Sequence, residues 1–185
     1  MIVAFGHKKG VGKNTAAKFL NTYLRCETSF CTQQASFADK LKEIAYQLYS
    51  WSGLKPGIFY ETHRYKKEVK LPKLDLSPRE IWIQIGNKLR EIYPATWINY
   101  LIKNNKSNQI LIISDLRFIN EAKAIQDTGG LLIKINRDVP RGFDSAEIDL
   151  DNWTNWNLII DNNGTFEDLN KKVIELIVPL IIKKE

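Results

Sequence analysis

A glycine- and lysine-rich segment near the start of the chain carries the strongest chemical signal in the sequence. Residues 6–15 read Gly-His-Lys-Lys-Gly-Val-Gly-Lys-Asn-Thr, which is close to the G-x-x-x-x-G-K-[ST] pattern of phosphate-binding loops. Backbone N–H groups of such a loop and of the following helix N-terminus surround a polyphosphate, and the lysine reaches its outer phosphates. The residues expected to bind nucleotide phosphates are Gly10, Val11, Gly12, Lys13, Asn14 and Thr15.

This loop departs from the pattern at two positions. His7 stands where the first glycine is expected, and Asn14 stands where a serine or threonine is usual. The alternative reading is a glycine-rich turn that only caps a helix. That reading leaves the convergence of Lys8, Lys9 and Lys13 on one short segment unexplained.

A second signal is an apolar run, Ile110 to Ile113, that ends in Ser114-Asp115. In phosphate-loop enzymes an aspartate at this place helps to position Mg²⁺, directly or through water. The alternative is an aspartate that caps the following helix. Arg117 and Glu121 follow at the same sheet edge, where ligands of open α/β folds bind.

Several cations could neutralise phosphate groups on two substrates. The planar fork of arginine binds phosphate through two hydrogen bonds, which suits a kinase that joins a triphosphate donor to a phosphorylated acceptor. Most lysines and arginines of any protein are only solvated surface, so residue type alone assigns none of them. The candidates are Lys9, Lys42, Arg64, Arg79, Arg117 and Arg137.

The elements needed to position these residues alternate between strands and helices. We expect strands at 2–5, 30–37, 110–113, 131–135 and 158–160. We expect helices at 14–25, 38–51, 78–92, 94–102, 120–127 and 166–177. The segment 52–75, punctuated by glycine and proline and rich in cations, is expected to be irregular and mobile. This alternation predicts a parallel three-layer α/β fold over 1–185 as one domain.

Composition narrows the class of protein. The chain has 185 residues, is 44% hydrophobic and carries a net charge of +6, which excludes a disordered polyampholyte, a collagen-like fibre and a disulfide scaffold. Its apolar runs are far shorter than the ~20 residues needed to cross a bilayer, and we expect no membrane partner. Cys26 and Cys31 match no metal-ligand spacing. With no signal peptide visible, we expect reduced thiols in a cytoplasmic protein.

The ordered motifs resemble those of the bacteriophage deoxynucleoside monophosphate kinases over nearly the whole chain. Residues 12–15 are similar to their G-K-D-T, and residues 36–42 to their S-F-A-D-x-x-K block. Residues 78–86 resemble their P-R-x-x-x-Q-x-x-G segment, which is followed by a tryptophan, here Trp97. Residues 115–121 resemble D-x-R-x-x-N-E, and residues 161–165 resemble an N-D-G-S turn.

The resemblance implies a P-loop kinase fold with a sheet of about five strands, a helical acceptor-binding segment at about 38–103 and a small lid. It implies transfer of the γ-phosphoryl group of ATP, with Mg²⁺, to a deoxynucleoside 5′-monophosphate. Lys13, Asp115 and Arg117 would be catalytic, and Arg137 would join the loop in binding ATP. The acceptor residues would be Lys9, Ser36, Lys42, Arg64, Arg79, Gln84, Trp97, Glu121 and Glu147.

Within this assignment Lys66 or Lys67 could serve in place of Arg64. The family usually has an acid where Asn14 stands and a histidine near Asp144. We therefore expect Mg²⁺ to be held mainly by ATP and water, with Asp115 acting through a water or as a base toward the acceptor.

Two other functions stay open at this point. One is a P-loop kinase of another acceptor, similar to a phosphomevalonate or cofactor kinase. The other is a basic nucleic-acid-binding module, which the absence of an aromatic and basic strand motif disfavours. The sequence does not decide the accepted bases, the sugar preference or whether the protein forms a homodimer.

Overall fold

The computed structural model describes residues 1–105, 108–138 and 148–184. The chain divides into two units, the first comprising Met1–Ala35 with Leu101–Glu185 and the second comprising Ser36–Tyr100.

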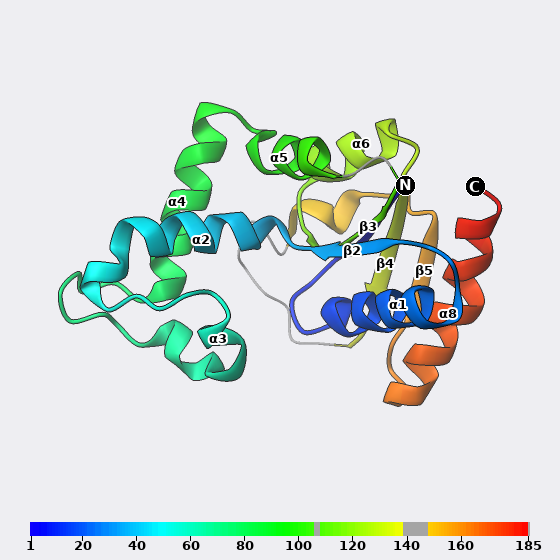
Figure 1. Cartoon of the computed structure of the whole chain (residues 1–185), viewed down its shortest axis with the longest axis horizontal. Helices are drawn as coiled ribbons and strands as arrows, with labels where there is room; N and C mark the ends of the chain where they lie inside the picture. The colour runs from blue at the N-terminus through cyan, green and yellow to red at the C-terminus, as the bar shows by residue number, and fades with distance from the viewer. Residues whose placement is uncertain (106–107, 139–147, 185) are drawn as a thin grey trace. The chain divides into compact units, whose positions relative to one another are not determined.

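A parallel sheet forms the centre of the first unit (Figure 1). Its strands lie in the order β2-β3-β1-β4-β5. Their bounds are β1 Ile2–Gly6, β2 Thr32–Ala35, β3 Ile110–Leu116, β4 Leu131–Asn136 and β5 Leu158–Asp161. The central strand β1 is buried along its whole length, as expected for a strand covered by helices on both faces. The predicted five-stranded parallel sheet is confirmed.

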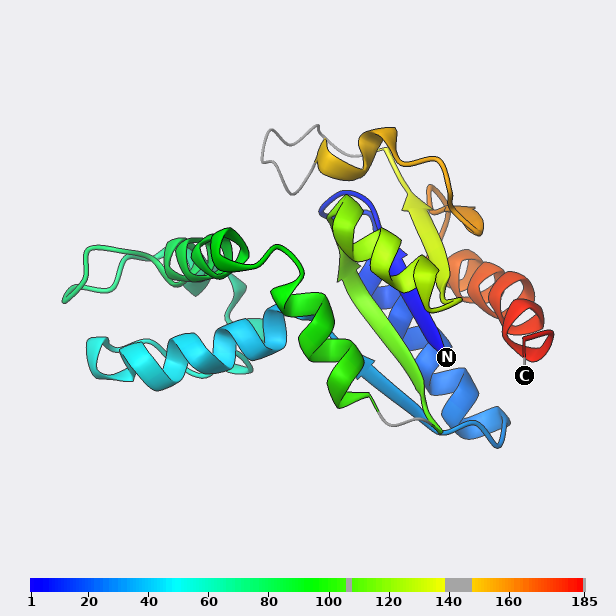
Figure 2. The ribbon, with the colours of Figure 1, turned by 90° about the horizontal axis from the view of Figure 1, so that it is seen from above.

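Helices cover both faces of this sheet, as Figure 2 shows for α6 in front of it and α1 behind it. On one face, Leu20 of α1 (Lys13–Glu27) and Val173 of α8 (Phe166–Ile182) share a core with alternate residues of the strands. On the other face, α6 (Ile119–Asp127) buries Ala122 and Ile125. The three layers agree with the predicted α/β class and place the carboxyl ends of the strands at one edge.

Helix α8 is longer than its sequence pattern suggested. The predicted helix ends at Ile177, whereas α8 continues through Pro179 to Ile182. Ile181 is fully buried in the core beside α1, so packing of the last turn compensates for the backbone hydrogen bond that proline cannot make.

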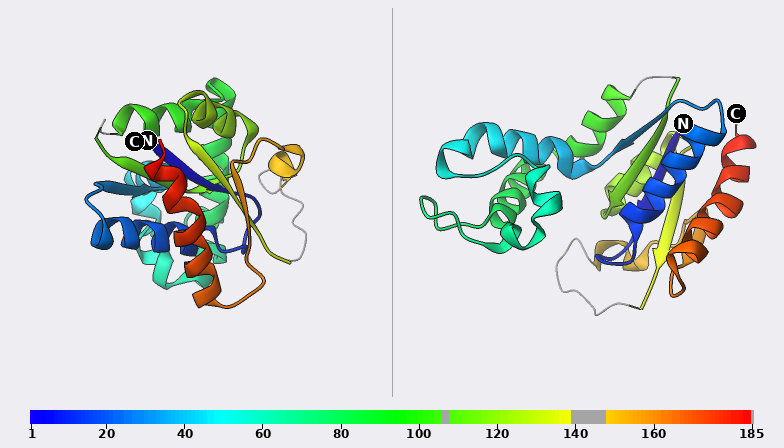
Figure 3. Two further views of the ribbon diagram at one scale, coloured as in Figure 1. Left: turned by 90° about the vertical axis from the view of Figure 1, so that its right-hand side faces the viewer. Right: turned by 60° about the horizontal axis from the view of Figure 1, so that its bottom comes forward.

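The second unit is helical (Figure 3). It contains α2 (Phe37–Tyr49), α4 (Pro78–Ile92) and the start of α5 (Thr96–Asn104). Ser36 and Ser77 cap α2 and α4, each through a reciprocal bond with an acid three residues later. The predicted helix from Pro78 to about Ile92 is confirmed.

The segment 52–75 is more regular than its composition indicated. It contains α3 (Phe59–Thr62) and the 3-10 helix η2 (Arg64–Glu68), after η1 (Ser50–Ser52). Tyr60 of α3 is buried and meets the ring of Trp82 edge-on, with 5.2 Å between their centroids. Tyr60 belongs to a buried cluster with Leu54, Ile81 and Trp82, so tertiary packing holds part of the segment against α4.

Of the helices in the described part of the chain, none combines the length and apolar character that crossing a bilayer requires.

Candidate functional site

The glycine-rich loop lies between β1 and α1, at the carboxyl edge of the sheet. β1 ends at Gly6 and α1 begins at Lys13, so the loop is formed by residues 7–12. Its backbone is left-handed at His7, Gly10 and Gly12, with φ of 96°, 82° and 101°. His7 therefore adopts a conformation that favours glycine, the residue that the loop pattern has at this position.

The side chain of Lys13 lies inside this loop and is 7% exposed. Its Nζ donates hydrogen bonds to the carbonyl oxygen of His7, at 2.6 Å, and to that of Lys8. The ammonium group is thus held at the loop by the loop's own backbone. A phosphate entering here would meet a positive charge already in place and could replace the carbonyls as its partner.

Asn162, which the sequence analysis did not single out, supports the loop from the turn between β5 and α8. It is 6% exposed, and its Nδ2 donates to the carbonyl oxygen of Val11 at 2.8 Å. A Cβ atom at Gly12 would lie 2.4 Å from this Nδ2, so the approach requires glycine. The only sequence clue was the position of Asn162 in the turn 161–165.

Asp115 is the second-last residue of β3, whose last residue, Leu116, pairs with Gly6 of β1, and Arg117 and Glu121 follow the strand. Asp115 and Arg117 are half-buried, whereas Glu121 is 2% exposed. The Glu121 carboxylate accepts hydrogen bonds from the backbone N–H groups of Arg117 and Phe118, both at 3.2 Å. Glu121 thus caps the start of α6, and its contact with an acceptor stays a prediction.

The same helix has a further cap. Asp149 accepts from the Ile119 N–H at 2.6 Å. This contact adds to the bonds of Glu121 at the start of α6. The role of Asp115 as a site residue stays a prediction.

His7 and Lys8 of the loop both contact Asp151. Its Nε2 lies 3.6 Å from Asp151 Oδ1, and Lys8 Nζ lies 3.5 Å from the same oxygen. Burial lowers the pKa of His7 to about 4, with Lys134 and Lys8 adding to the effect and Asp151 opposing it. His7 is therefore uncharged at neutral pH.

The other predicted site residues of the first unit are placed as follows. Lys9 and Asn14 are exposed, and Thr15 is half-buried in the first turn of α1. Arg137 is exposed just after β4. Glu147 and the neighbouring Asp144 lie outside the described residues.

In the second unit, the predicted acceptor residues fall into a cationic group and three others. Lys42 Nζ lies 3.0 Å from Glu61 Oε1. Arg79 Nε lies 2.5 Å from Glu68 Oε1. Arg64 is exposed on η2 and Gln84 is exposed on α4. The hydroxyl of Ser36 accepts from the Ala38 N–H at 3.1 Å as the cap of α2.

Trp97, the predicted acceptor residue expected near the base, is buried in the second unit. It is 4% exposed, and its Nε1 donates to the Gly86 carbonyl at 3.4 Å. These surroundings give Trp97 a packing role in the second unit. Its contact with a base stays a prediction.

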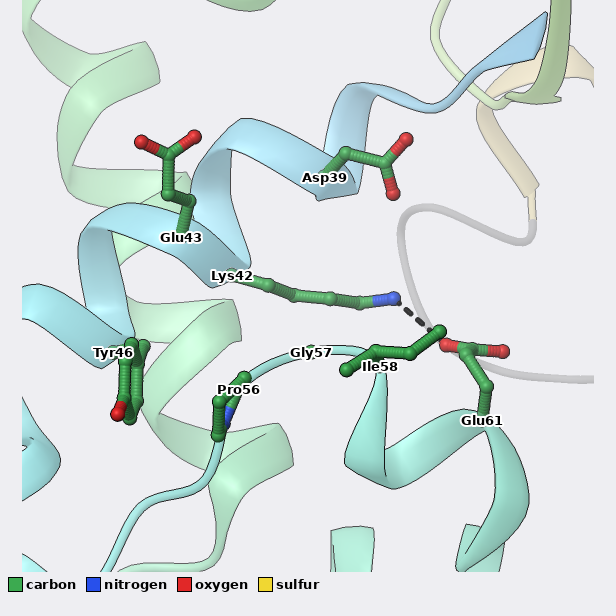
Figure 4. A pocket seen from close by; sticks show the side chains of 8 residues that line it. All are labelled: Asp39, Lys42, Glu43, Tyr46, Pro56, Gly57, Ile58 and Glu61. Carbon is green, nitrogen blue, oxygen red and sulfur yellow. Dashed lines mark hydrogen bonds and ion pairs between the residues drawn. The ribbon is translucent and has the colours of Figure 1, made fainter.

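A cavity of about 370 Å³ opens in the second unit between α2 and the segment that leads into α3 (Figure 4). Lys42 crosses it and ends at Glu61. Its lining residues are Asp39, Lys42, Glu43, Tyr46, Pro56, Gly57, Ile58 and Glu61.

Comparison with known proteins finds a sequence relative and solved structures of similar fold. No family model matches the chain. It is 28% identical over 186 residues to the "Putative deoxynucleotide monophosphate kinase" of Acanthamoeba polyphaga mimivirus, covering 91% of this chain and 92% of that protein. Dephospho-CoA kinase from Campylobacter jejuni superposes over 100% of both chains, with a TM-score of 0.51 and 17% identity. Shikimate kinase from Aquifex aeolicus superposes over 98% of both chains, with a TM-score of 0.47 and 11% identity.

The likeness to dephospho-CoA kinase confirms the predicted parallel α/β fold, which is that of a P-loop kinase. The sequence relative belongs to a mimivirus and not to a bacteriophage, so the predicted phage family stays a prediction.

The burial of His7 makes stability depend on pH. In the unfolded chain a histidine titrates near 6.5, whereas the pKa of folded His7 is about 4, so between these values the unfolded state binds more protons. We expect His7 to lower the free energy of unfolding as the pH falls through this window, by at most about 1.4 kcal/mol per pH unit.

Urea unfolding at a series of pH values checks this expectation. His7→Asn, a residue that tolerates the left-handed backbone, should lose part of the dependence. His63→Asn is the matched control, because His63 is exposed, and it should retain the dependence. Equal pH profiles for the parent and His7→Asn would contradict the assignment.

Proposed function

We propose that this protein transfers the γ-phosphoryl group of ATP to a deoxynucleoside 5′-monophosphate, producing ADP and a deoxynucleoside diphosphate. The observation that carries the proposal is the buried Lys13 ammonium inside the β1–α1 loop. The likeness to the mimivirus protein over 91% of the chain supports a deoxynucleotide acceptor.

On the donor side, the loop would bind ATP through its backbone and Lys13. N–H groups of 10–15 would surround the phosphates, and Lys13 would exchange its carbonyl partners for β- and γ-phosphate oxygens. Because the charge is fixed in place before the reaction, it stabilises the transferring group without reorganisation. Thr15 would bond the α-phosphate, and Arg137 would add a cation beyond β4.

Oxygen donors near the loop fit Mg²⁺. The carboxylate of Asp115 is a hard oxygen ligand of the kind this ion prefers, and because Mg²⁺ retains several waters we expect it to be held mainly by ATP and water. Bound with ATP, the ion supplies neutralisation of charge on the β- and γ-phosphate oxygens. Asp115 would act through a water, or as a base toward an acceptor phosphate that arrives as the protonated monoanion, and Arg117 would balance charge beside it.

On the acceptor side, we propose that the range 36–100 holds the monophosphate. This range nearly coincides with the segment 38–103 that the motifs assign to the acceptor. Lys42 and Arg79 of this range would bind the phosphate, and Gln84 would contact the nucleoside part of the acceptor. The remaining proposed contacts are Lys9, Ser36, Trp97, Glu121, Glu147 and one cation of η2, which is either Arg64 or its alternative Lys67.

A coupled assay of ADP release across deoxynucleoside and nucleoside monophosphates tests the proposal. We expect release that depends on at least one deoxynucleoside monophosphate and stays near background without acceptor. Dephospho-CoA is included because the fold alone does not select the acceptor. ADP release with dephospho-CoA and with none of the monophosphates would contradict the proposal.

Asn14 and Asp115 should differ in their effect on turnover. Because Mg²⁺ retains several waters and few protein ligands, Asn14→Ala should lower kcat/KM by no more than about tenfold. Asp115→Asn keeps the shape of the side chain but removes its charge, and should reduce kcat by about 10² or more. The opposite order, with Asn14→Ala rescued by additional Mg²⁺, would show that the amide is a direct metal ligand.

A further inference from the structure

One carboxylate oxygen in the second unit is shared by two lysines. Glu61 Oε1 lies 3.0 Å from Lys42 Nζ and 3.6 Å from Lys67 Nζ. The three residues come from α3, α2 and η2, so the contact ties together three elements of the unit. The two lysine side chains are each 18% exposed, which is far more buried than is usual for solvated surface cations.

The cations of this group repel one another and depend on nearby anions. Burial lowers the pKa of Lys67, and the charges of Lys42 and Arg79 add to this effect, while Glu61 opposes it. The pKa of Glu61 is lowered although burial acts in the opposite direction, because the hydrogen bond and charge of Lys42 outweigh burial. Two partly desolvated cations thus face a single ionised carboxylate.

The position of Lys42 is set by a close approach to Gly57. A Cβ atom at Gly57 would lie 3.0 Å from Lys42 Cδ and 3.2 Å from its Cβ, so the absence of a side chain lets the lysine stem pass. The stem crosses the cavity of about 370 Å³ and delivers its ammonium to Glu61 (Figure 4). A cavity of this size can accept the remainder of a small phosphate ester.

The geometry distinguishes Lys67 from Arg64, its neighbour on η2. Lys67 Nζ reaches Glu61, whereas Arg64 is exposed. The motifs had favoured Arg64 for the acceptor phosphate and left Lys66 and Lys67 as alternatives. The observed grouping of cations selects Lys67.

We propose that Lys42 and Lys67 form the site for the acceptor's phosphate dianion, and that Glu61 fills this site until the phosphate displaces it. The acceptor's identity rests on the proposed function, but the site itself does not require turnover. A phosphate dianion carries more charge and more acceptor oxygens than a carboxylate, so it competes for both lysines. Its charge also repels Glu61, which must leave the lysines for the phosphate to bind.

Glu61 therefore limits which anions can bind to Lys42 and Lys67, because an anion must displace its carboxylate. Monoanions such as carboxylates or phosphodiesters interact too weakly with the two lysines to displace Glu61. A phosphate monoester dianion interacts strongly enough to displace it. Because the acceptor phosphate competes with Glu61, it binds more weakly than it would to the two lysines alone.

A titration with inorganic phosphate at constant ionic strength, followed by residue-resolved ¹H–¹⁵N NMR, tests the site directly. The amide signals of Glu61 and Lys67 report on it, and those of Gly10 and Gly12 report separately on phosphate in the loop. In Glu61→Gln, which keeps the shape but removes the charge, we expect phosphate to bind the lysine site about three- to tenfold more tightly. The loop affinity should not change.

Glu43→Gln is the matched control. Glu43 also lines the cavity from α2, but its carboxylate bonds to Lys40 at 2.8 Å, so the same loss of charge should change phosphate affinity less than about twofold. Lys67→Ala should weaken binding at the lysine site about fivefold or more, and Arg64→Ala less than about twofold.

Unchanged or weaker phosphate binding in Glu61→Gln would overturn the proposal, as would a larger loss in Arg64→Ala than in Lys67→Ala. These outcomes are independent of the acceptor. If Glu61→Gln binds phosphate more tightly while no monophosphate supports ADP release, the site stands and the proposed function fails. If deoxynucleotides are phosphorylated but phosphate affinity does not respond to Glu61, the function stands and this site fails.

Discussion

The Lys13 ammonium group, held against two backbone carbonyls inside the β1–α1 loop, is the interaction on which the first unit depends. A charge buried to this degree is costly unless hydrogen bonds satisfy it. The loop can offer its carbonyls only because the backbone turns left-handed at His7, Gly10 and Gly12. Asn162 then holds the Val11 carbonyl from the β5–α8 turn, so that turn helps to fix the loop.

The Lys13 ammonium group and the pair formed by Lys42 and Lys67 are each occupied by anionic or dipolar partners of the protein itself. Lys13 bonds to carbonyl oxygens, and Lys42 with Lys67 bonds to Glu61. In each case a phosphate offers a more highly charged partner in place of the protein's oxygen. Binding is then an exchange of partners, which keeps the buried charges compensated in the free protein and makes affinity depend on the charge of the ligand.

Much of the sheet was predictable because its signals are local. The unbroken apolar runs of β1 and β3 require burial on both faces, and the loop between β1 and α1 follows from glycine and lysine spacing. The site outside this loop was less accessible to prediction. Asn162 supports the loop from a position 151 residues after Val11, and Glu61 meets Lys42 from a segment that packs against Trp82 through Tyr60. Trp97 was assigned from a motif that does not reveal burial.

The turnover of Lys13→Ala compared with Lys8→Ala, measured with ATP and the best monophosphate of the panel, tests the central claim most directly. Both substitutions remove one lysine charge from the same loop, but the Lys8 side chain pairs with Asp151, whereas the Lys13 ammonium lies inside the loop. The account predicts that Lys13→Ala lowers kcat by about 10²–10³ with the fold intact, and that Lys8→Ala has a much smaller effect. Activity of Lys13→Ala within about threefold of the parent would contradict the assignment of the loop as the site of phosphoryl transfer.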